Sequence, residues 1–175
     1  MRLKRYDYTD PGYYFITICT HQRRMLFGNI ENEAIHMNEL GEIAQEKWRE
    51  ISNHFENVNL DYFVVMPNHI HGIIQIIDSQ SVETRHASSL QNMDIKPISG
   101  VKPKSLCAII GSYKAAVSRQ INRSSIPSDT PIWQRGFYDH IIRNESSLIK
   151  LRQYIENNPL QWQLDHENPI NLSKR

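Results

Sequence analysis

Aromatic and β-branched runs along the chain alternate with segments whose apolar residues recur every three to four positions. The first pattern is typical of strands and the second of amphipathic helices. Strands are predicted at Tyr13–Thr20, Val58–Met66, His69–Ile77 and Ile132–Arg143, the last of them bent at Gly136. Because the turn residues Pro67-Asn68 separate the second strand from the third, these two strands are expected to form a hairpin.

Each helical segment begins at a polar residue of the kind that caps a helix N-terminus. The predicted caps are Asn38, Ser105 and Asn144, and the helices extend to about His54, Asn122 and Asn158. Pro159 ends the last helix, because the residue before a proline avoids the helical conformation. The first six elements follow the order β-α-β-β-α-β. This order predicts an α+β fold, a ferredoxin-like antiparallel sheet with helices on one face, followed by a C-terminal helix.

Length and composition predict a single domain spanning residues 1–175. Apolar residues make up 39% and charged residues 22% of the chain, which is typical of a globular domain. No internal repeat or shift in composition indicates a second domain. The serine-rich segment from Asp78 to Lys104 is predicted to be a long flexible loop.

The chain has no sequence feature of export or membrane insertion. Its apolar runs fall short of the ~20 residues that a membrane helix needs, and no apolar stretch follows the basic N-terminus. The cysteines, Cys19 and Cys107, lack the spacing of a disulfide framework or a zinc site, which fits a reducing compartment. We therefore expect a cytoplasmic protein without membrane contacts.

The formal net charge of +1 conceals two segments of opposite charge. Acids outnumber bases between Asn29 and Asp61, whereas the segment from Ile95 to Ser128 contains bases and no acid. Such a basic segment could bind a polyphosphate, or it could be a solvated helix face whose charge is balanced elsewhere. Charge alone leaves both interpretations open.

The motif MPNHIHG at residues 66–72 is the sharpest chemical signal in the chain. Side chains alternate along a strand, so His69 and His71 are expected on one face and Ile70 on the other, in the core. Two imidazoles at this spacing can bind one metal ion, although the pair could equally be structural. Gly72 would let a ligand or another backbone approach closely.

The last helix places two polar residues on one face. Tyr154 and Asn158 are four positions apart and are therefore neighbours on the helix, beside an apolar stripe of Leu148, Leu151 and Ile155. A tyrosine hydroxyl and an amide oxygen would then project together from the rim of that stripe. The alternative is a packing tyrosine followed by a helix-capping asparagine.

Together these segments resemble the single-tyrosine HUH transposases of insertion sequences, and especially their REP-associated tyrosine transposase branch. The resemblance rests on MPNHIHG and a later YI-x-x-NP block, in the correct order and separated by a basic helix, and on the segments YYFITICTHQR, SLCAIIGSYKAAVSRQIN and IWQRGFYDHIIRNE. It implies that His69 and His71 bind a metal and that Tyr154 is the nucleophile. Asn158 would be the third ligand, where other branches have a glutamine. The loop at 78–104 is the least family-like part.

The resemblance also implies an enzyme that nicks and rejoins single-stranded or hairpin DNA through a 5′-phosphotyrosine. The ion would be Mg²⁺ or Mn²⁺, of which two nitrogen ligands favour Mn²⁺. The protein would act as a monomer or homodimer in a bacterial cytoplasm, associated with the nucleoid when bound to DNA. One alternative is a domesticated hairpin-binding protein without transposition activity. A histidine-motif nucleotide hydrolase is disfavoured, because position 73 is isoleucine and not a third histidine.

Residues expected to contact DNA are basic or aromatic. Phosphate contacts are predicted for Lys104, Lys114, Arg119, Arg123 and Arg135, and base stacking for Trp133, Phe137, Tyr138, Tyr6 or Tyr8. Trp133 and Phe137 could instead belong to the core. Tyr138 shares its strand parity with His140 and is the alternative nucleophile.

Overall fold

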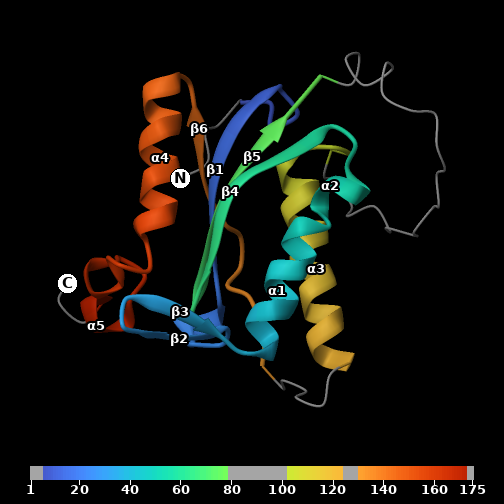
Figure 1. The fold of residues 1–175 in the computed structure, drawn as a ribbon. Helices are drawn as coiled ribbons and strands as arrows, with labels where there is room; N and C mark the ends of the chain where they lie inside the picture. Colours follow the sequence, from blue (N-terminus) through green and yellow to red (C-terminus); the bar gives the residue numbers. More distant parts are fainter. Residues whose placement is uncertain (1–5, 79–101, 124–129, 173–175) are drawn as a thin grey trace.

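The computed structural model describes residues 6–78, 102–123 and 130–172 (Figure 1). Its main sheet has four antiparallel strands in the order β4-β5-β1-β6. These strands are β1 (Gly12–Cys19), β4 (Val58–Met66), β5 (His69–Ile76) and β6 (Tyr138–Ile142). Since β5 lies between β1 and β4, and β1 lies between β5 and β6, two β-α-β units are interleaved. The predicted ferredoxin-like fold class is confirmed.

Helices cover both faces of this sheet. On one face lie α1 (Glu39–Arg49), α2 (Ile51–His54) and α3 (Leu106–Arg123), and on the other lies α4 (Glu145–Asn157), as Figure 1 shows. The first face has the larger apolar core, which includes the fully buried Trp48. The second has a smaller core, in which Phe15 of β1 packs near Leu148 and Ile155 of α4. The sheet therefore separates α4 from the basic helix α3.

The predicted helix N-caps are confirmed. Asn38 Oδ1 accepts from the Gly41 N–H at 3.0 Å, Ser105 Oγ from the Ala108 N–H at 3.3 Å, and Asn144 Oδ1 from the Ser147 N–H at 2.8 Å. The segment predicted as one helix to His54 is divided at Glu50 into α1 and α2.

The fourth strand is shorter than predicted. It begins at Tyr138, and residues 132–137 form an irregular segment with an isolated bridge at Trp133. Trp133 is buried in the larger core, and its indole N–H donates to the backbone oxygen of Lys114, so the segment is bound both to the end of β1 and to α3. At Gly136 the chain turns with a φ of +76°, a conformation that favours glycine.

The hydrophobic pattern does not predict several short elements. They are η1 (His21–Arg23), the hairpin of β2 (Gly28–Glu31) and β3 (Ala34–Met37), η3 (Trp162–Leu164) and α5 (Pro169–Leu172). The loop predicted at 78–104 lies, for residues 79–101, outside the described part of the chain. Within the described ranges no helix is both long and apolar enough to cross a bilayer. Both cysteines are free thiols.

Candidate active site

The strand register places the two histidines of MPNHIHG on the face covered by α4. β5 pairs with β1 so that His71 lies opposite Thr17 and His69 lies opposite Cys19. Directly paired residues share a face of the sheet. The two buried imidazoles are 4.4 Å apart between ring centroids, while Ile70 enters the larger core on the other face. The alternation predicted from the sequence is therefore present.

Asn68 determines which nitrogen of His69 is free. Its amide nitrogen donates to the backbone oxygens of Arg23 at 3.3 Å and Glu167 at 2.7 Å. Its amide oxygen therefore faces His69 Nδ1, at 2.8 Å. Because that oxygen only accepts, Nδ1 carries the proton and Nε2 keeps its lone pair. His69 Nε2 is buried and has no hydrogen-bond partner among the described residues.

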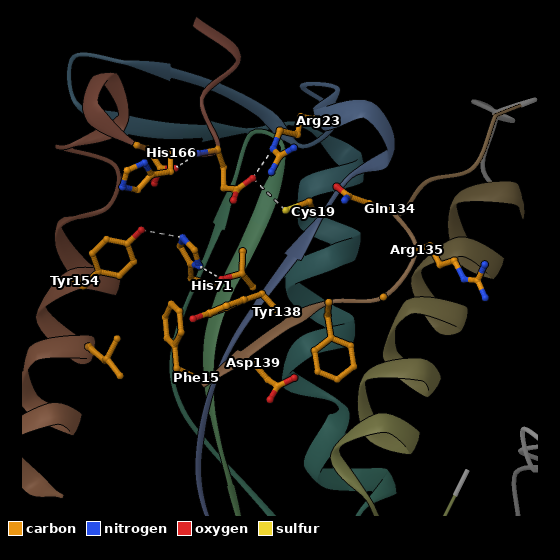
Figure 2. Close-up of a pocket in the computed structure, with 16 residues that line it drawn as sticks. Phe15, Cys19, Arg23, His71, Gln134, Arg135, Tyr138, Asp139, Tyr154 and His166 are labelled. Carbon is orange, nitrogen blue, oxygen red and sulfur yellow. Dashed lines mark hydrogen bonds and ion pairs between the residues drawn. The ribbon is translucent and has the colours of Figure 1, made fainter. Parts of the chain in front are cut away.

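His71 is held between β1 and α4 (Figure 2). Its Nδ1 lies 2.9 Å from Thr17 Oγ1, and its Nε2 lies within hydrogen-bond distance of the Tyr154 hydroxyl, at 3.3 Å. The ring also stacks on Phe15 with 5.2 Å between centroids. Burial lowers the pKa of His69 to about 3 and that of His71 well below its usual value. Both imidazoles are therefore neutral at pH 7, the form that can bind a metal ion.

Helix α4 brings Tyr154 to the histidine pair across 83 positions of sequence. Ile155 is buried in the smaller core, which leaves the preceding Tyr154 half-buried at the edge of the cavity. Burial raises the pKa of the Tyr154 phenol to about 12. One turn later, Asn158 forms the C-cap of α4 and is also buried. The predicted nucleophile and the expected third ligand thus lie at one site.

A carboxylate that the motifs do not predict belongs to the same group. Asp165 is buried, and its Oδ2 accepts a hydrogen bond from Asn158 Nδ2 at 2.7 Å and lies 4.0 Å from His69 Nε2. Ligand atoms of His69, His71 and Asp165 all lie within 4.8 Å of one another. The available sequence signal is the acidic run Asp165-His166-Glu167 that follows the end of α4.

Glu167 holds the segment that contains Asp165 against the chain near the end of β1. Its carboxylate accepts hydrogen bonds from Arg23 Nε and, at 3.3 Å, from Cys19 Sγ. Burial alone would raise the pKa of Glu167, but the hydrogen bond and charge of Arg23 lower it overall. Glu167 is therefore ionised at neutral pH, and the segment is bound to the chain before β2.

The side chains at this site suit a divalent metal ion. The amide oxygen of Asn158, like His69 Nε2, is buried without a hydrogen-bond partner in the described ranges. An unsatisfied buried polar atom costs about 1–3 kcal/mol and is rare in native proteins. A cation would satisfy both lone pairs, and the Asp165 carboxylate would balance part of its charge. Imidazole, amide and carboxylate together form a mixed nitrogen and oxygen donor set of the kind Mn²⁺ accepts.

A cavity of about 730 Å³ opens beside Tyr154 (Figure 2). Helix α4 packs mainly on β4 and β5, which leaves the β1 and β6 part of this face open. Phe15, Thr17 and Tyr138 line the cavity on that side, and the irregular segment before β6 forms a further wall. The candidate nucleophile is therefore accessible from one side of the sheet.

The predicted phosphate contacts do not all lie beside Tyr154. Arg119 and Arg123 are exposed on α3, across the sheet from α4 (Figure 1). Lys104 is exposed just before that helix, whereas Lys114 is engaged with backbone oxygens of the irregular segment. Arg135 is exposed and lines the cavity. A DNA molecule that contacts both α3 and Tyr154 would have to pass around the sheet.

Burial divides the aromatic residues that were candidates for base stacking. Trp133 and Tyr8 are buried in the larger core, and Tyr6 and Phe137 pack against it. Tyr138 is 52% exposed and lines the cavity. The core interpretation of Trp133 is therefore confirmed, and Tyr138 is the candidate that a base can reach.

Comparison with known proteins assigns a class to this fold. A solved structure of a REP-associated tyrosine transposase bound to a REP hairpin matches with a TM-score of 0.61 and 16% identity, covering 93% of this chain and 74% of that one. A Haemophilus influenzae protein inferred to be a REP-associated tyrosine transposase is 24% identical over 160 residues, 90% of this chain and 75% of that protein. The fold is that of the REP-associated tyrosine transposases, as the motifs indicate.

A closer match in sequence defines the family. An uncharacterized protein of Haemophilus influenzae is 38% identical over 165 residues, which cover 94% of this chain and 89% of that protein. The chain belongs to the same family as this protein. No family model matches the chain.

Proposed function

We propose that the protein is a metal-dependent DNA endonuclease and strand transferase, a transposase that acts on single-stranded or hairpin DNA. The observation that carries this proposal is the Tyr154 hydroxyl 3.3 Å from His71 Nε2, beside the group of His69, His71 and Asp165. The similar solved structure is bound to a REP hairpin, which supports hairpin DNA as the substrate. Since this substrate is DNA, the proposed location is the cytoplasm, with the protein associated with the nucleoid when it is bound to DNA.

The metal ion, Mg²⁺ or Mn²⁺, would be held by Nε2 of His69, Nε2 of His71, the Asp165 carboxylate and the Asn158 amide oxygen. When bound, it would act as a Lewis acid toward a phosphate oxygen. The hydrogen bond from Nδ1 to Asn68 holds His69 in the tautomer that leaves Nε2 free, and Thr17 Oγ1 positions the ring of His71 through its Nδ1. Asn158 also orients Asp165 through its amide nitrogen.

Tyr154 would supply the nucleophile. Its phenolic oxygen attacks phosphorus, a tyrosyl–phosphate bond forms, and the bond from phosphorus to the 3′ oxygen breaks. The leaving oxygen takes up a proton to become a 3′-hydroxyl, and the phenol releases its proton to solvent. The phosphodiester energy is retained in the 5′-phosphotyrosine, so a later hydroxyl can rejoin the strand. Because burial raises the phenol pKa to about 12, this proton is still bound when the attack begins.

A labelled DNA hairpin with single-stranded extensions, incubated with Mn²⁺, tests the proposal. The wild-type protein should form an adduct with DNA that survives denaturing electrophoresis. Tyr154→Phe removes only the attacking oxygen, so this variant should bind the hairpin and form no adduct. Tyr62→Phe, at an exposed tyrosine of β4, is the matched control and should react like the wild type.

Mass spectrometry of the adduct then locates the modified residue. A nucleotide on the peptide that contains Tyr154 supports the mechanism. Attachment at Tyr138, or cleavage that persists in Tyr154→Phe, would overturn the assignment. Hairpin binding without any adduct would favour the alternative function, a domesticated hairpin-binding protein without transposition activity.

A further inference from the structure

The cavity beside Tyr154 is larger than a phosphate group requires. Its volume of about 730 Å³ falls within the roughly 300–1,000 Å³ of small-molecule binding sites. It continues from Tyr154 over the part of the sheet that α4 leaves open (Figure 2). When Tyr154 attacks a phosphate, the groups joined to that phosphate need room next to Tyr154, and this cavity provides it. In DNA those groups are nucleosides.

Tyr138 provides an exposed aromatic surface in this cavity. It is paired with Thr17, which is paired with His71, so the three side chains form a row across β6, β1 and β5. In Figure 2 the Tyr138 side chain extends over the sheet toward Phe15 and His71. Exposed aromatic rings on antiparallel sheets are a common means of stacking unpaired bases. The position of Tyr138 therefore suits a base next to the reacting phosphate.

Lys114 of α3 holds one wall of the cavity in place. Its ammonium donates to the backbone oxygens of Gln134 at 2.7 Å and Gly136 at 2.8 Å, and its own backbone oxygen accepts from the Trp133 indole at 3.0 Å. On the other side, the Gln134 N–H donates to the backbone oxygen of Cys19 at 2.9 Å. The Gln134 amide, exposed at the cavity, can both donate and accept, as the edge of a base requires.

We propose that this cavity is a subsite for one unpaired nucleotide joined to the scissile phosphate, with its base stacked on Tyr138 and its edge at Gln134. The proposal rests on the proposed function, because cleavage is what brings this nucleotide to the cavity. Three carboxylates line the cavity, those of Asp139, Asp165 and Glu167, and the last two are hydrogen-bonded within the protein. The exposed Arg135 adds positive charge at the edge of the cavity nearest α3 (Figure 2).

A hairpin with 2-aminopurine placed in turn at each unpaired position tests the subsite, in buffer with EDTA so that no cleavage occurs. At one position, binding of the wild-type protein should quench the fluorescence, because 2-aminopurine is quenched when it stacks. Tyr138→Phe keeps the ring and should keep the quenching. Tyr138→Ala and Tyr138→Leu should lose it and weaken hairpin binding about tenfold. Tyr62→Ala, at a tyrosine that is 41% exposed on β4, is the matched control and should keep both.

Quenching that is unchanged in Tyr138→Ala and Tyr138→Leu, or lost equally in Tyr62→Ala, would overturn the subsite. Thermal unfolding of each variant confirms that it is folded, and Tyr138→Leu covers the case in which alanine disturbs the sheet. The two proposals fail separately. If the wild type forms the adduct but Tyr138→Ala does not change the quenching, the subsite is wrong and the proposed nuclease function stands. If quenching depends on Tyr138 but no adduct forms, the nuclease function is wrong and the cavity is only a binding site.

Discussion

The side chains of Asn68 and His69 are hydrogen-bonded to each other, with Asn68 Oδ1 2.8 Å from His69 Nδ1. The amide nitrogen of the same asparagine binds the backbone oxygen of Glu167, two residues after Asp165. A single buried side chain in the β4–β5 turn therefore sets the tautomer of one candidate metal ligand and the position of the segment that carries another. Residues that orient a metal ligand in this way commonly contribute to metal affinity.

Replacing Asn68 by alanine should therefore weaken Mn²⁺ binding about 10- to 100-fold without unfolding the protein. Isothermal titration calorimetry with Mn²⁺ measures the affinity without any DNA. Asn57→Ala is the matched control, because Asn57 is also buried but donates to the backbone oxygen of Lys104. Equal effects of the two substitutions on Mn²⁺ affinity would show that Asn68 contributes only to the fold.

Asp165→Asn should weaken Mn²⁺ binding at least about tenfold, because it removes a charge while it keeps the shape of the side chain. His69→Ala and His71→Ala should have effects of the same sign. Asp61→Asn is the control, since Asp61 is a carboxylate paired with Arg152 away from the cavity. Calorimetry and the Mn²⁺ electron paramagnetic resonance spectrum measure binding. If Asp165→Asn bound Mn²⁺ with wild-type affinity, Asp165 would not be a ligand, and the ligands would be His69, His71 and Asn158 alone.

Local periodicity predicted the directions of the histidine pair and of Tyr154, whereas their roles in the site followed from the family resemblance. Alternation along β5 turns His69 and His71 to one face, and helical spacing puts Tyr154 beside Asn158. Asp165 could not be found in this way. It lies in an irregular segment whose position depends on hydrogen bonds from residues far away in the chain, so no local pattern reports its direction.

The start of β6 shows the same limit in the fold. The run Ile132–Phe137 contains the aromatic and β-branched residues of a strand, and local propensity favours that assignment. Tertiary contacts decide otherwise, because the Trp133 side chain is buried against α3 and Lys114 binds the backbone oxygens of Gln134 and Gly136. The departure from local propensity occurs where the chain forms the wall of the cavity.

Gly72→Ala should destabilise the protein by about 1–3 kcal/mol, the usual range for an overpacked core. The sequence predicted the approach of a ligand or another backbone at Gly72, but the neighbour in the structure is the side chain of Trp48 of α1. A Cβ at this position would lie 2.2 Å from Trp48 Cζ2. Urea denaturation measures the loss. The double variant with Trp48→Phe should show a favourable coupling with Gly72→Ala, and strict additivity of the two single effects would contradict the clash.

Arg119→Gln combined with Arg123→Gln should weaken hairpin binding and reduce the slope of log affinity against log salt by about 2, since each phosphate contact contributes about 0.9. Both side chains are exposed on α3. Lys114→Gln should leave the slope nearly unchanged, because this ammonium is bound to backbone oxygens. Fluorescence anisotropy over a range of salt concentrations measures both. An unchanged slope in the double variant would show that this face of α3 is only solvated.

The metal-free protein should lose stability as the pH falls below about 6.5, before its carboxylates begin to titrate. An unfolded histidine takes up a proton near pH 6.5, whereas burial lowers the pKa of His69 to about 3 in the folded state. Between these values the unfolded chain binds more protons, so the free energy of unfolding falls by up to about 1.4 kcal/mol per pH unit for each such histidine.

Urea denaturation in EDTA between pH 5 and 7 measures this slope. His69→Gln should flatten it, while His36→Gln, at an exposed histidine of β3, should not. The same slope in all three proteins would mean that His69 becomes protonated without unfolding.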